Sequence, residues 1–387
     1  YKTGTLTIGK ATNPITVKTN TLTYNGKTQN LVTTANAQGN VYYSVGTELT
    51  SSNYKTAGST TIPTRKDANV SGYVVYYYCE GNTNYSAKAG SVTTKINKAS
   101  LTITADNKTM TYGGTAPTYT YTGAGYVLGG TASYTVKNSS GTAVTVNSTT
   151  AAGTYTITPS GLSSSNYNIT YKTGTLTIGK ATNPITVKAN TLTYNGKAQN
   201  LVTTTNAQGA VYYSVGTALT SSNYTTAGST TIPTQTAANE SGYVVYYYCV
   251  GNGNYNAKNG NVIVKINKKN PIMTVRNASM IVQDGSSSTF TYTYDGDGAV
   301  TVKSSDTSIA TCSVNTSTKT VTVNALKTST KAVTITVNAG AGTNYNATSK
   351  TVQIGAIVVT GIPTSWTKND ATVTATTTLS GHTIQTC

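Results

Sequence analysis

The sequence predicts an all-β protein built from a string of β-sandwich domains, and its composition gives the first reasons. Threonine makes up about a fifth of the 387 residues, and the chain holds 30 tyrosines. Branched and aromatic side chains pack well on the pleated surface of a strand. The 36 glycines supply turn positions, and no stretch keeps the period of an amphipathic helix. The length fits three or four domains.

A long internal repeat divides the chain. Residues 1–98 align with 171–268 without a gap, and 17 of these 98 positions differ, which leaves 81 identical. The period of 170 residues is too long for a solenoid unit of roughly 20–50 residues. It fits a pair of domains that was copied together. Pro14 and Pro184 occupy equivalent places in the two copies, where they bar a helix and stiffen the linker between domains.

The turn signals place the domain at residues 10–98. Strand patterns occur near 15–24, 29–35, 40–46, 73–80 and 90–97, and turns are expected at YNGK, NAQG and GNTN. Short strands at this spacing are typical of a β-sandwich. The near-copy at 180–268 is expected to follow the same plan.

The rest of the chain is divided by the same reasoning. Residues 1–9 are expected to be the last strand of a preceding domain of the same kind as 99–179, because the same letters end that domain. Residues 99–179 and 269–355 alternate with the period of two that belongs to strands. Residues 356–387 are expected to begin a further, incomplete domain.

These domains resemble known bacterial modules. Residues 99–179 resemble the MBG domain of the YGX type, through LTITADNKTMTYGGTAPTYTYTG and GTYTITPSGLSSSNYNITYKTGTLTI. The domains at 10–98, 180–268 and 269–355 resemble bacterial Ig-like domains, best in SSDTSIATCSV and VTITVNAGAGTNYNA. The resemblance implies tandem Ig-like β-sandwich domains, which we expect to form an extended rod. It also implies a large secreted, surface or phage structural protein, and it carries no catalytic residues.

The charge of the chain bears on its partners. The formal net charge is +17, from 27 basic and 10 acidic residues, but only Arg65 and Arg276 are arginines. Nucleic acid is not an expected partner, because bidentate recognition of phosphates and bases uses arginine. Scattered lysines protect sheet edges from pairing with other chains, and a diffuse positive field attracts anionic polymers. No apolar run approaches the roughly 18 residues that span a bilayer, so we expect no membrane contact by this segment.

Three cysteines are expected to be buried free thiols. Cys79 and Cys249 occupy equivalent positions, where alternation turns them inward, and Cys312 lies in IATCSV, where an apolar residue is expected. No complete domain holds a second cysteine, which excludes a disulfide inside a domain. Free cysteine packs as a small hydrophobic residue; a reactive or intermolecular thiol is the alternative. The role of Cys387 stays open.

The tyrosines offer two roles. Tyr73, Tyr155 and Tyr243 stand in SGY and AGTY contexts and are expected to be corner tyrosines, whose ring packs inside while the hydroxyl bonds to nearby backbone. The YYY runs at 76–78 and 246–248 raise the alternative of glycan binding, because exposed rings stack on sugars. Packing across strands explains the same tyrosines.

Catalytic and metal-binding residues are scarce. DGDG at 295–298 supplies two carboxylates, fewer than a calcium loop needs, so a hairpin turn is expected there. The single His382 has no zinc-ligand spacing around it, and it excludes a Ser–His–Asp arrangement in the complete domains. We therefore predict no enzyme activity, no cofactor and no metal.

The drift between the copies favours a structural role. Lys55 becomes Thr225 and Glu80 becomes Val250, whereas SGYVVYYYC is unchanged. We expect a stalk or spacer segment of a large bacterial cell-surface protein, an adhesin, located outside the cell.

Two other functions remain as alternatives. One is a structural fibre or decoration protein of a bacteriophage particle, located on the virion surface. The other is an accessory, non-catalytic region of a secreted carbohydrate-active enzyme. Host or cell-surface glycans and anionic polymers are expected as partners through other domains, and the oligomeric state stays open.

Overall fold

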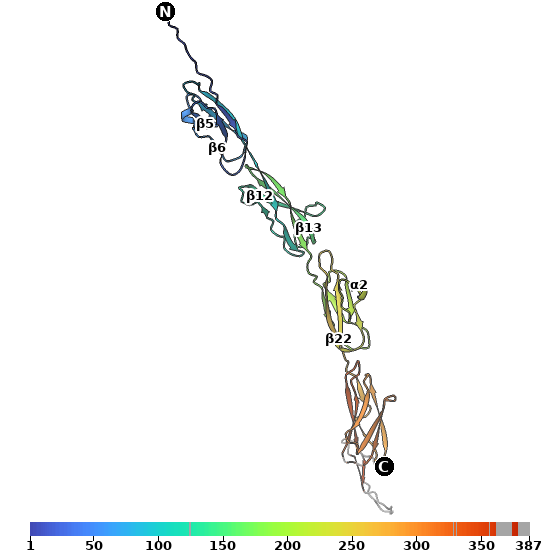
Figure 1. Cartoon of the computed structure of the whole chain (residues 1–387). Helices are drawn as coiled ribbons and strands as arrows, with labels where there is room; N and C mark the ends of the chain where they lie inside the picture. Colours follow the sequence, from blue (N-terminus) through green and yellow to red (C-terminus); the bar gives the residue numbers. More distant parts are fainter. Residues whose placement is uncertain (124, 328, 330, 356, 361–373, 378–387) are drawn as a thin grey trace, which may run out of the picture. The chain divides into compact units, whose positions relative to one another are not determined.

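The computed structural model describes residues 1–123, 125–327, 329, 331–355, 357–360 and 374–377. The chain forms two compact units, Tyr1–Ala181 and Thr182–Cys387, whose strands are drawn in Figure 1. Within each unit, sheets enclose apolar cores. The predicted all-β class and the tandem Ig-like β-sandwich fold are confirmed.

The first sandwich of unit one occupies residues 10–98. Its elements are β1 (Thr16–Thr19), β2 (Leu22–Thr23), β3 (Gln29–Asn30), β4 (Val32–Ala35), β5 (Val41–Val45), α1 (Tyr54–Ala57), β6 (Thr64–Arg65), β7 (Asn69–Cys79) and β8 (Lys88–Asn97). One sheet has the order β2-β8-β7-β5, in which β2 and β8 run parallel and the other pairs antiparallel. The facing ladders pair β1 with β4 and β3 with β6.

The core of this sandwich follows from the alternation of its strands. Val75 and Cys79 on β7 point inward with Ile96 on β8, and all three are fully buried. From the facing layer, Leu31 and Val17 close the core. Fully burying an aliphatic side chain contributes about 1.5–3 kcal/mol, so this cluster stabilises the packing of the two layers.

The second sandwich of unit one occupies residues 99–179. Its strands are β9 (Ala99–Ala105), β10 (Lys108–Thr111), β11 (Tyr121–Thr122), β12 (Gly129–Lys137), β13 (Gly153–Ser163), β14 (Tyr167–Lys172) and β15 (Gly174–Gly179). They form sheets of order β10-β15-β13-β12 and β11-β9-β14. Ile157 and Leu176 are fully buried between the two sheets, with Ile103 from β9.

The first sandwich of unit two repeats the plan of residues 10–98. Its elements are β16 (Thr186–Ala189), β17 (Leu192–Thr193), β18 (Gln199–Asn200), β19 (Val202–Thr205), β20 (Val211–Val215), α2 (Tyr224–Ala227), β21 (Thr234–Gln235), β22 (Asn239–Cys249) and β23 (Lys258–Asn267). The sheet order β17-β23-β22-β20 and the ladders β16-β19 and β18-β21 match those of the first copy. The 17 sequence differences thus leave the topology unchanged.

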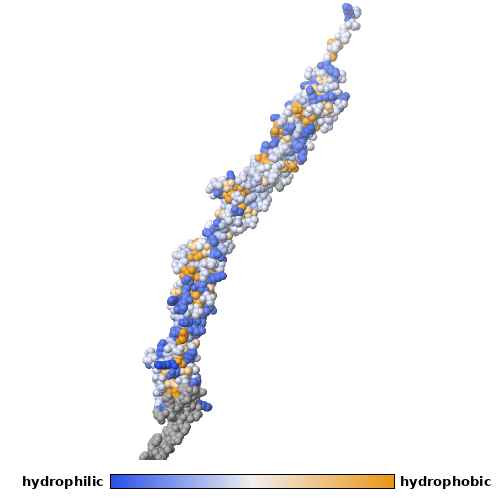
Figure 2. All heavy atoms as spheres, turned by 180° about the vertical axis from the view of Figure 1, so that it is seen from behind, coloured by the Kyte–Doolittle hydropathy of each residue, from blue (hydrophilic) through white to orange (hydrophobic). Residues whose placement is uncertain are grey.

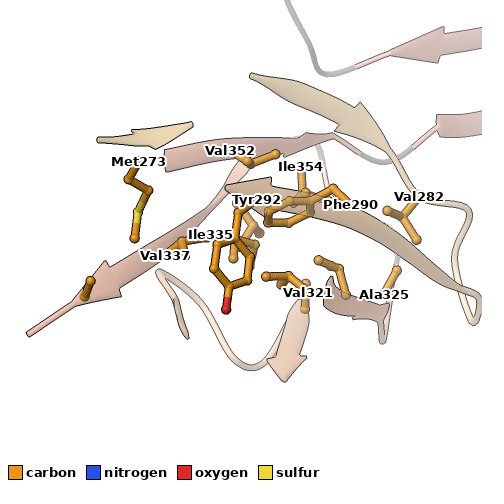
Figure 3. Packing of buried hydrophobic residues seen from close by; sticks show 14 residues of the cluster. Met273, Val282, Phe290, Tyr292, Val321, Ala325, Ile335, Val337, Val352 and Ile354 are labelled. Carbon is orange, nitrogen blue, oxygen red and sulfur yellow. The ribbon is translucent and has the colours of Figure 1, made fainter. Parts of the chain in front are cut away.

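The last complete sandwich lies between residues 269 and 355. Its strands are β24 (Met273–Val275), β25 (Ser279–Ile281), β26 (Ser287–Tyr294), β27 (Val300–Ser304), β28 (Ala310–Asn315), β29 (Thr320–Ala325), β30 (Val333–Ala339) and β31 (Thr348–Gly355). The sheets have the orders β24-β26-β29-β28 and β25-β31-β30-β27. Figure 3 shows Phe290, Tyr292 and Val321 from the first sheet pointing toward Ile335 and Val352 from the second. Beyond it, β32 (Ile357–Thr360) pairs antiparallel with β33 (Thr374–Thr377).

The strand expected at residues 1–9 is absent. The same nine residues form the end of β14 and all of β15 at 171–179, where Leu176 and Ile178 are 0 % and 2 % exposed. At the start of the chain, Leu6 and Ile8 are both 85 % exposed. Strand β15 lies between β10 and β13, and the described residues place no such neighbours beside 1–9.

Two short elements in each of the repeated domains, a helical turn and a two-residue strand, were not expected from the sequence. The helical turns α1 and α2 are four residues long, and no helix in the described ranges is long and apolar enough to cross a membrane. The strands β6 and β21 are two residues long. Segments this short carry no detectable period, so pattern analysis does not find them.

The surface carries its apolar residues in separate small groups. Figure 2 shows these groups among hydrophilic residues on the visible face. Large exposed apolar side chains include Val70, Val127 and Ile263, which lie in different domains. Single exposed apolar residues are normal on protein surfaces, so these residues do not by themselves indicate a binding site.

Candidate functional site

Cys79 and Cys249 are buried, and each lies against a buried asparagine. Both thiols are 0 % exposed. The Asn13 side-chain amide donates to Cys79 Sγ at 3.2 Å and to the Gln38 carbonyl at 2.9 Å. Asn183 makes the same 3.2 Å contact with Cys249. Each sulfur therefore accepts a hydrogen bond inside a core, which is a structural use of a thiol.

Cys312 is free but only half-buried, so the prediction of a buried thiol is wrong for this residue. It lies on β28, an edge strand of its sheet, where solvent reaches part of the side chain. Burial still raises the pKa of the Cys312 thiol. A raised pKa lowers the fraction of reactive thiolate. Cys387 and His382 lie outside the described residues.

The tyrosine face near YYY packs within its own domain. The ring of Tyr54, from α1, stacks on Tyr78 with centroids 4.4 Å apart and meets Tyr42 edge-to-face at 4.9 Å. The second copy repeats both contacts, with Tyr224 on Tyr248 at 4.7 Å and on Tyr212 at 4.8 Å. Tyr54 thus covers one face of the Tyr78 ring, and that face cannot stack on a sugar.

A polar cluster beside this face is present in one copy only. Glu80 accepts hydrogen bonds from Asn40 at 3.0 Å and Tyr54 at 3.1 Å, and it pairs with Lys55 at 3.4 Å. The bond from Asn40, helped by Tyr54 and Lys55, lowers the pKa of Glu80. The corresponding residues in the second copy are Ala210, Thr225 and Val250. Because the partners change together, the two domains do not share a binding site here.

The DGDG segment is not a hairpin. It leads from β26 in one sheet to β27 in the other. Its two carboxylates accept hydrogen bonds from backbone N–H groups. Asp295 Oδ1 accepts the Ile272 N–H at 2.6 Å, and Asp297 Oδ2 accepts the Asn344 N–H at 2.8 Å. Over the described residues, no group of three His, Cys, Asp or Glu side chains gathers in a way that could hold a metal ion.

Each of the three tyrosines in SGY and AGTY contexts bonds to a nearby carbonyl through its hydroxyl. Tyr73 donates to Asp67 at 2.9 Å, Tyr155 to Ala151 at 2.8 Å, and Tyr243 to Ala237 at 2.9 Å. The rings pack against the cores of their domains. In each case the bond fixes a loop just before the long strand that leads into the core.

A bulge positions Tyr73 for this bond. The register of β7 against β8 shifts between Asn69 and Tyr73, and Gly72 adopts a φ of 100°, which favours glycine. Asn69 closes the bulge, because its side chain accepts the Gly72 N–H at 2.9 Å and donates to the Gly72 carbonyl at 3.1 Å.

The fixed loop forms a joint with the following domain of unit one. Ala68, next to the carbonyl that Tyr73 holds, donates its backbone N–H to Asn166 Oδ1 at 2.8 Å. The ring of Tyr167 meets Tyr24 edge-to-face, with centroids 5.2 Å apart and planes at 85°. One asparagine–tyrosine pair thus contacts two parts of the preceding domain.

Two further bonds support this joint. The Asn166 amide donates to Asp67 Oδ1 at 3.1 Å, and Lys98 Nζ donates to the Ser164 carbonyl at 2.9 Å. Asn166 itself is half-buried. Both bonds tie the loop at 164–166 to the domain before it.

The same joint occurs inside unit two. Ala238 donates its backbone N–H to Asn344 Oδ1 at 2.9 Å, and Tyr345 meets Tyr194 edge-to-face at 5.4 Å. Lys269 Nζ lies 5.6 Å from the centre of the Tyr345 ring. Ala238 and Tyr194 correspond to Ala68 and Tyr24, whereas the asparagine and tyrosine come from a domain that is not a copy of 99–179.

The joint is the candidate functional site. It offers one backbone hydrogen bond, worth about 0.5–1.5 kcal/mol net, and one aromatic pair, worth about 0.5–1.5 kcal/mol. Such contacts hold two domains in a preferred orientation but do no chemistry. The sequence signal that would have pointed to it is an Asn-Tyr pair followed by Asn or Ser, at 84–86, 166–168, 254–256 and 344–346; the pair alone also occurs at 53–54 and 223–224, which form no such joint in the described part of the structure.

A comparison with known protein families finds a match for one domain of the chain. Residues 101–177 match the family model of the MBG domain (YGX type), within the range 99–179 expected from the sequence. No curated protein matches the sequence.

Solved structures were also compared. Surface layer protein SbsC, domains 1–6, is 16 % identical, with 83 % of this chain and 51 % of that chain covered and a TM-score of 0.24. The longer SbsC structure, rSbsC(31-844), is 16 % identical, with 90 % and 55 % covered and a TM-score of 0.24. The immunoglobulin domains 1–5 of Sidekick-1 are 9 % identical, with 89 % and 80 % covered and a TM-score of 0.23.

The chain spans about half the length of the two surface-layer structures. The Ig-like fold is seen in the paired sheets of each domain, and one domain also matches a family model. Residues 101–177 thus match the MBG domain of the YGX type, within a chain of Ig-like β-sandwich domains.

Proposed function

We propose that this chain is a structural spacer, or stalk, segment of a large extracellular bacterial surface protein, and that the parent protein is an adhesin. The observation that carries the proposal is the joint. In unit one, Ala68 and Tyr24 contact an asparagine and a tyrosine of the domain at 99–179. In unit two, their counterparts Ala238 and Tyr194 make the same contacts with a different kind of domain.

The pattern of change between the copies supports this role. The corner tyrosine, the two joint positions and all core residues but one are the same in residues 10–98 and 180–268, the exception being buried Thr94, which is Val264 in the second copy. The polar cluster around Glu80, by contrast, is lost. A spacer requires domains that bury their own cores and joints that limit bending between neighbours. It requires no shared surface site, and the charged side chains are then free to change.

Immunogold electron microscopy of the source culture tests the location. An antibody raised against residues 99–268 is expected to label the cell envelope, and antibody that has been absorbed with the purified chain serves as the control. Label confined to virions would overturn the proposal in favour of a phage fibre. Label that is found only on secreted enzyme in the medium would overturn it in favour of an accessory region.

A further inference from the structure

The turn at Asn84 and Tyr85 repeats the element that makes the two joints. The Ala11 N–H donates to the Asn84 carbonyl at 2.8 Å, and Ala11 forms a parallel bridge with Tyr85. In the next domain Ala99 donates to the Asn166 carbonyl at 3.0 Å. In unit two, Lys269 donates to the Asn344 carbonyl at 2.9 Å and bridges Tyr345 in parallel.

This turn is held in shape by its own domain. Asn82 Oδ1 accepts the N–H groups of Asn84 and Tyr85 at 2.9 and 3.0 Å, and the Asn82 N–H donates to the Tyr85 carbonyl at 3.0 Å. The Asn84 side chain is exposed, whereas Asn166 and Asn344 are half-buried at their joints. Asn84 and Tyr85 therefore form a preformed joint element, in which the Asn84 side chain is exposed and Tyr85 is half-buried.

The segment that leads into this domain identifies the kind of partner. Residues 1–9 are identical to 171–179, the end of the MBG domain. In that domain Leu176 and Ile178 are buried, but Leu6 and Ile8 are each 85 % exposed. The chain before Lys10 thus has the sequence and the apolar face of the last strand of an MBG-type domain.

An MBG-type domain has, at its trailing end, a backbone N–H and a tyrosine ring that correspond to those of Ala68 and Tyr24. The Tyr155 hydroxyl donates to the Ala151 carbonyl, as the Tyr73 hydroxyl donates to the Asp67 carbonyl. Ala152 comes directly after Ala151, and Ala68 comes directly after Asp67. The Tyr112 N–H donates to the Gly179 carbonyl at the end of the last strand at 2.8 Å. Tyr24 does the same with Asn97 at 2.9 Å. Ala152 and Tyr112 are therefore the counterparts of Ala68 and Tyr24.

We propose that the turn at Asn84 and Tyr85 is a docking surface for the trailing end of an MBG-type domain. Asn84 Oδ1 accepts the backbone N–H that corresponds to Ala152, and the Tyr85 ring packs edge-to-face on the tyrosine that corresponds to Tyr112. This partner goes beyond the proposed spacer role, because it specifies which kind of domain the surface accepts.

The test places such a domain ahead of the chain. A copy of residues 99–170 is joined directly before Tyr1, so that Tyr1–Gly9 completes its last strand. An exposed Thr149→Ser change in the added copy gives its peptides a distinct mass and keeps the hydroxyl that bonds to Asn147. Hydrogen exchange is then followed by mass spectrometry in the peptide that contains the added counterpart of Ala152.

The expected result is that Asn84→Ala speeds exchange of this amide by about fivefold, the effect of losing one hydrogen bond. Asn84→Asp keeps an oxygen acceptor and is expected to leave exchange slow. In the chain without the added copy, Asn84→Ala is expected to leave thermal unfolding unchanged. Asn166→Ala is the positive control, because it must speed exchange at Ala68 in both chains.

Equal exchange in the Asn84→Ala and unaltered extended chains would overturn the proposal. Loss of stability from Asn84→Ala in the chain without the added copy would also overturn it, because the side chain would then serve only its own domain. The readout uses purified protein, so either failure leaves the immunogold test of the spacer role standing.

Discussion

Replacing Tyr73 with phenylalanine tests the link between a domain core and its joint. The change removes one hydroxyl and keeps the ring, so it opens no cavity. The hydroxyl donates to the Asp67 carbonyl at 2.9 Å, and the next residue, Ala68, donates to Asn166 at 2.8 Å. One hydrogen bond contributes about 0.5–1.5 kcal/mol net. We therefore expect the free energy of unfolding of the first domain to fall by about 1 kcal/mol and the Ala68 amide to exchange about fivefold faster.

Hydrogen exchange measured by mass spectrometry resolves this effect in the full chain. The segment at 65–70 reads RKDANV, whereas its counterpart at 235–240 reads QTAANE, so peptides from the two copies differ in mass. Tyr243→Phe is the matched control and is expected to speed exchange at Ala238 alone. If Tyr73→Phe lowers stability but leaves the Ala68 amide unchanged, the corner tyrosine does not support the joint, and the reasoning is refuted.

Three further predictions concern single domains. Ile157→Ala removes a fully buried side chain and is expected to destabilise the second domain by about 2–5 kcal/mol. Calorimetry should show one unfolding transition at a lower temperature, and an unchanged scan would contradict the assigned core. Cys79→Val leaves one buried N–H of Asn13 without its sulfur acceptor, at a cost of about 1–3 kcal/mol in urea unfolding, and Cys79→Ser is expected to cost less. The lowered pKa of Glu80 means that its stabilisation is present above the unfolded pKa and is lost as pH falls through the lower folded value. Acid below about pH 4.3 should therefore weaken the first domain more than its copy, which has Val250, and equal acid sensitivity in fluorescence-monitored unfolding would count against this.

The sequence predicts most of the fold because the signals for strands are local. The pattern at 73–80 lies inside β7 apart from its last residue, and the regions near 15–24 and 29–35 contain β1 to β4. Residues 1–9 show the limit of this reasoning, because a local pattern does not supply the strands that a strand pairs with. The same nine letters are strand and buried at 171–179 but irregular and exposed at the start of the chain, because a strand depends on the neighbours that pair with it.

The candidate site was much harder to predict. The bond from Ala68 to Asn166 joins residues 98 apart, and the bond from Ala238 to Asn344 joins residues 106 apart. No local pattern connects such positions. The corner tyrosines could be found from sequence because their partners lie four to six residues away. The DGDG segment was misjudged because a crossing between sheets and a hairpin use the same turn residues.

The most direct test of the spacer account compares the full chain with a chain that lacks residues 10–179. The deletion joins Gly9 to Lys180 and restores the sequence found at 179–180, so each remaining domain keeps its own strands. Small-angle X-ray scattering of both proteins gives their maximum dimensions. A spacer predicts a decrease of about 70–80 Å, two sandwich lengths of roughly 35–40 Å each from strand rise and end turns. A maximum dimension that hardly changes would contradict the account, because the domains would then not be adding length.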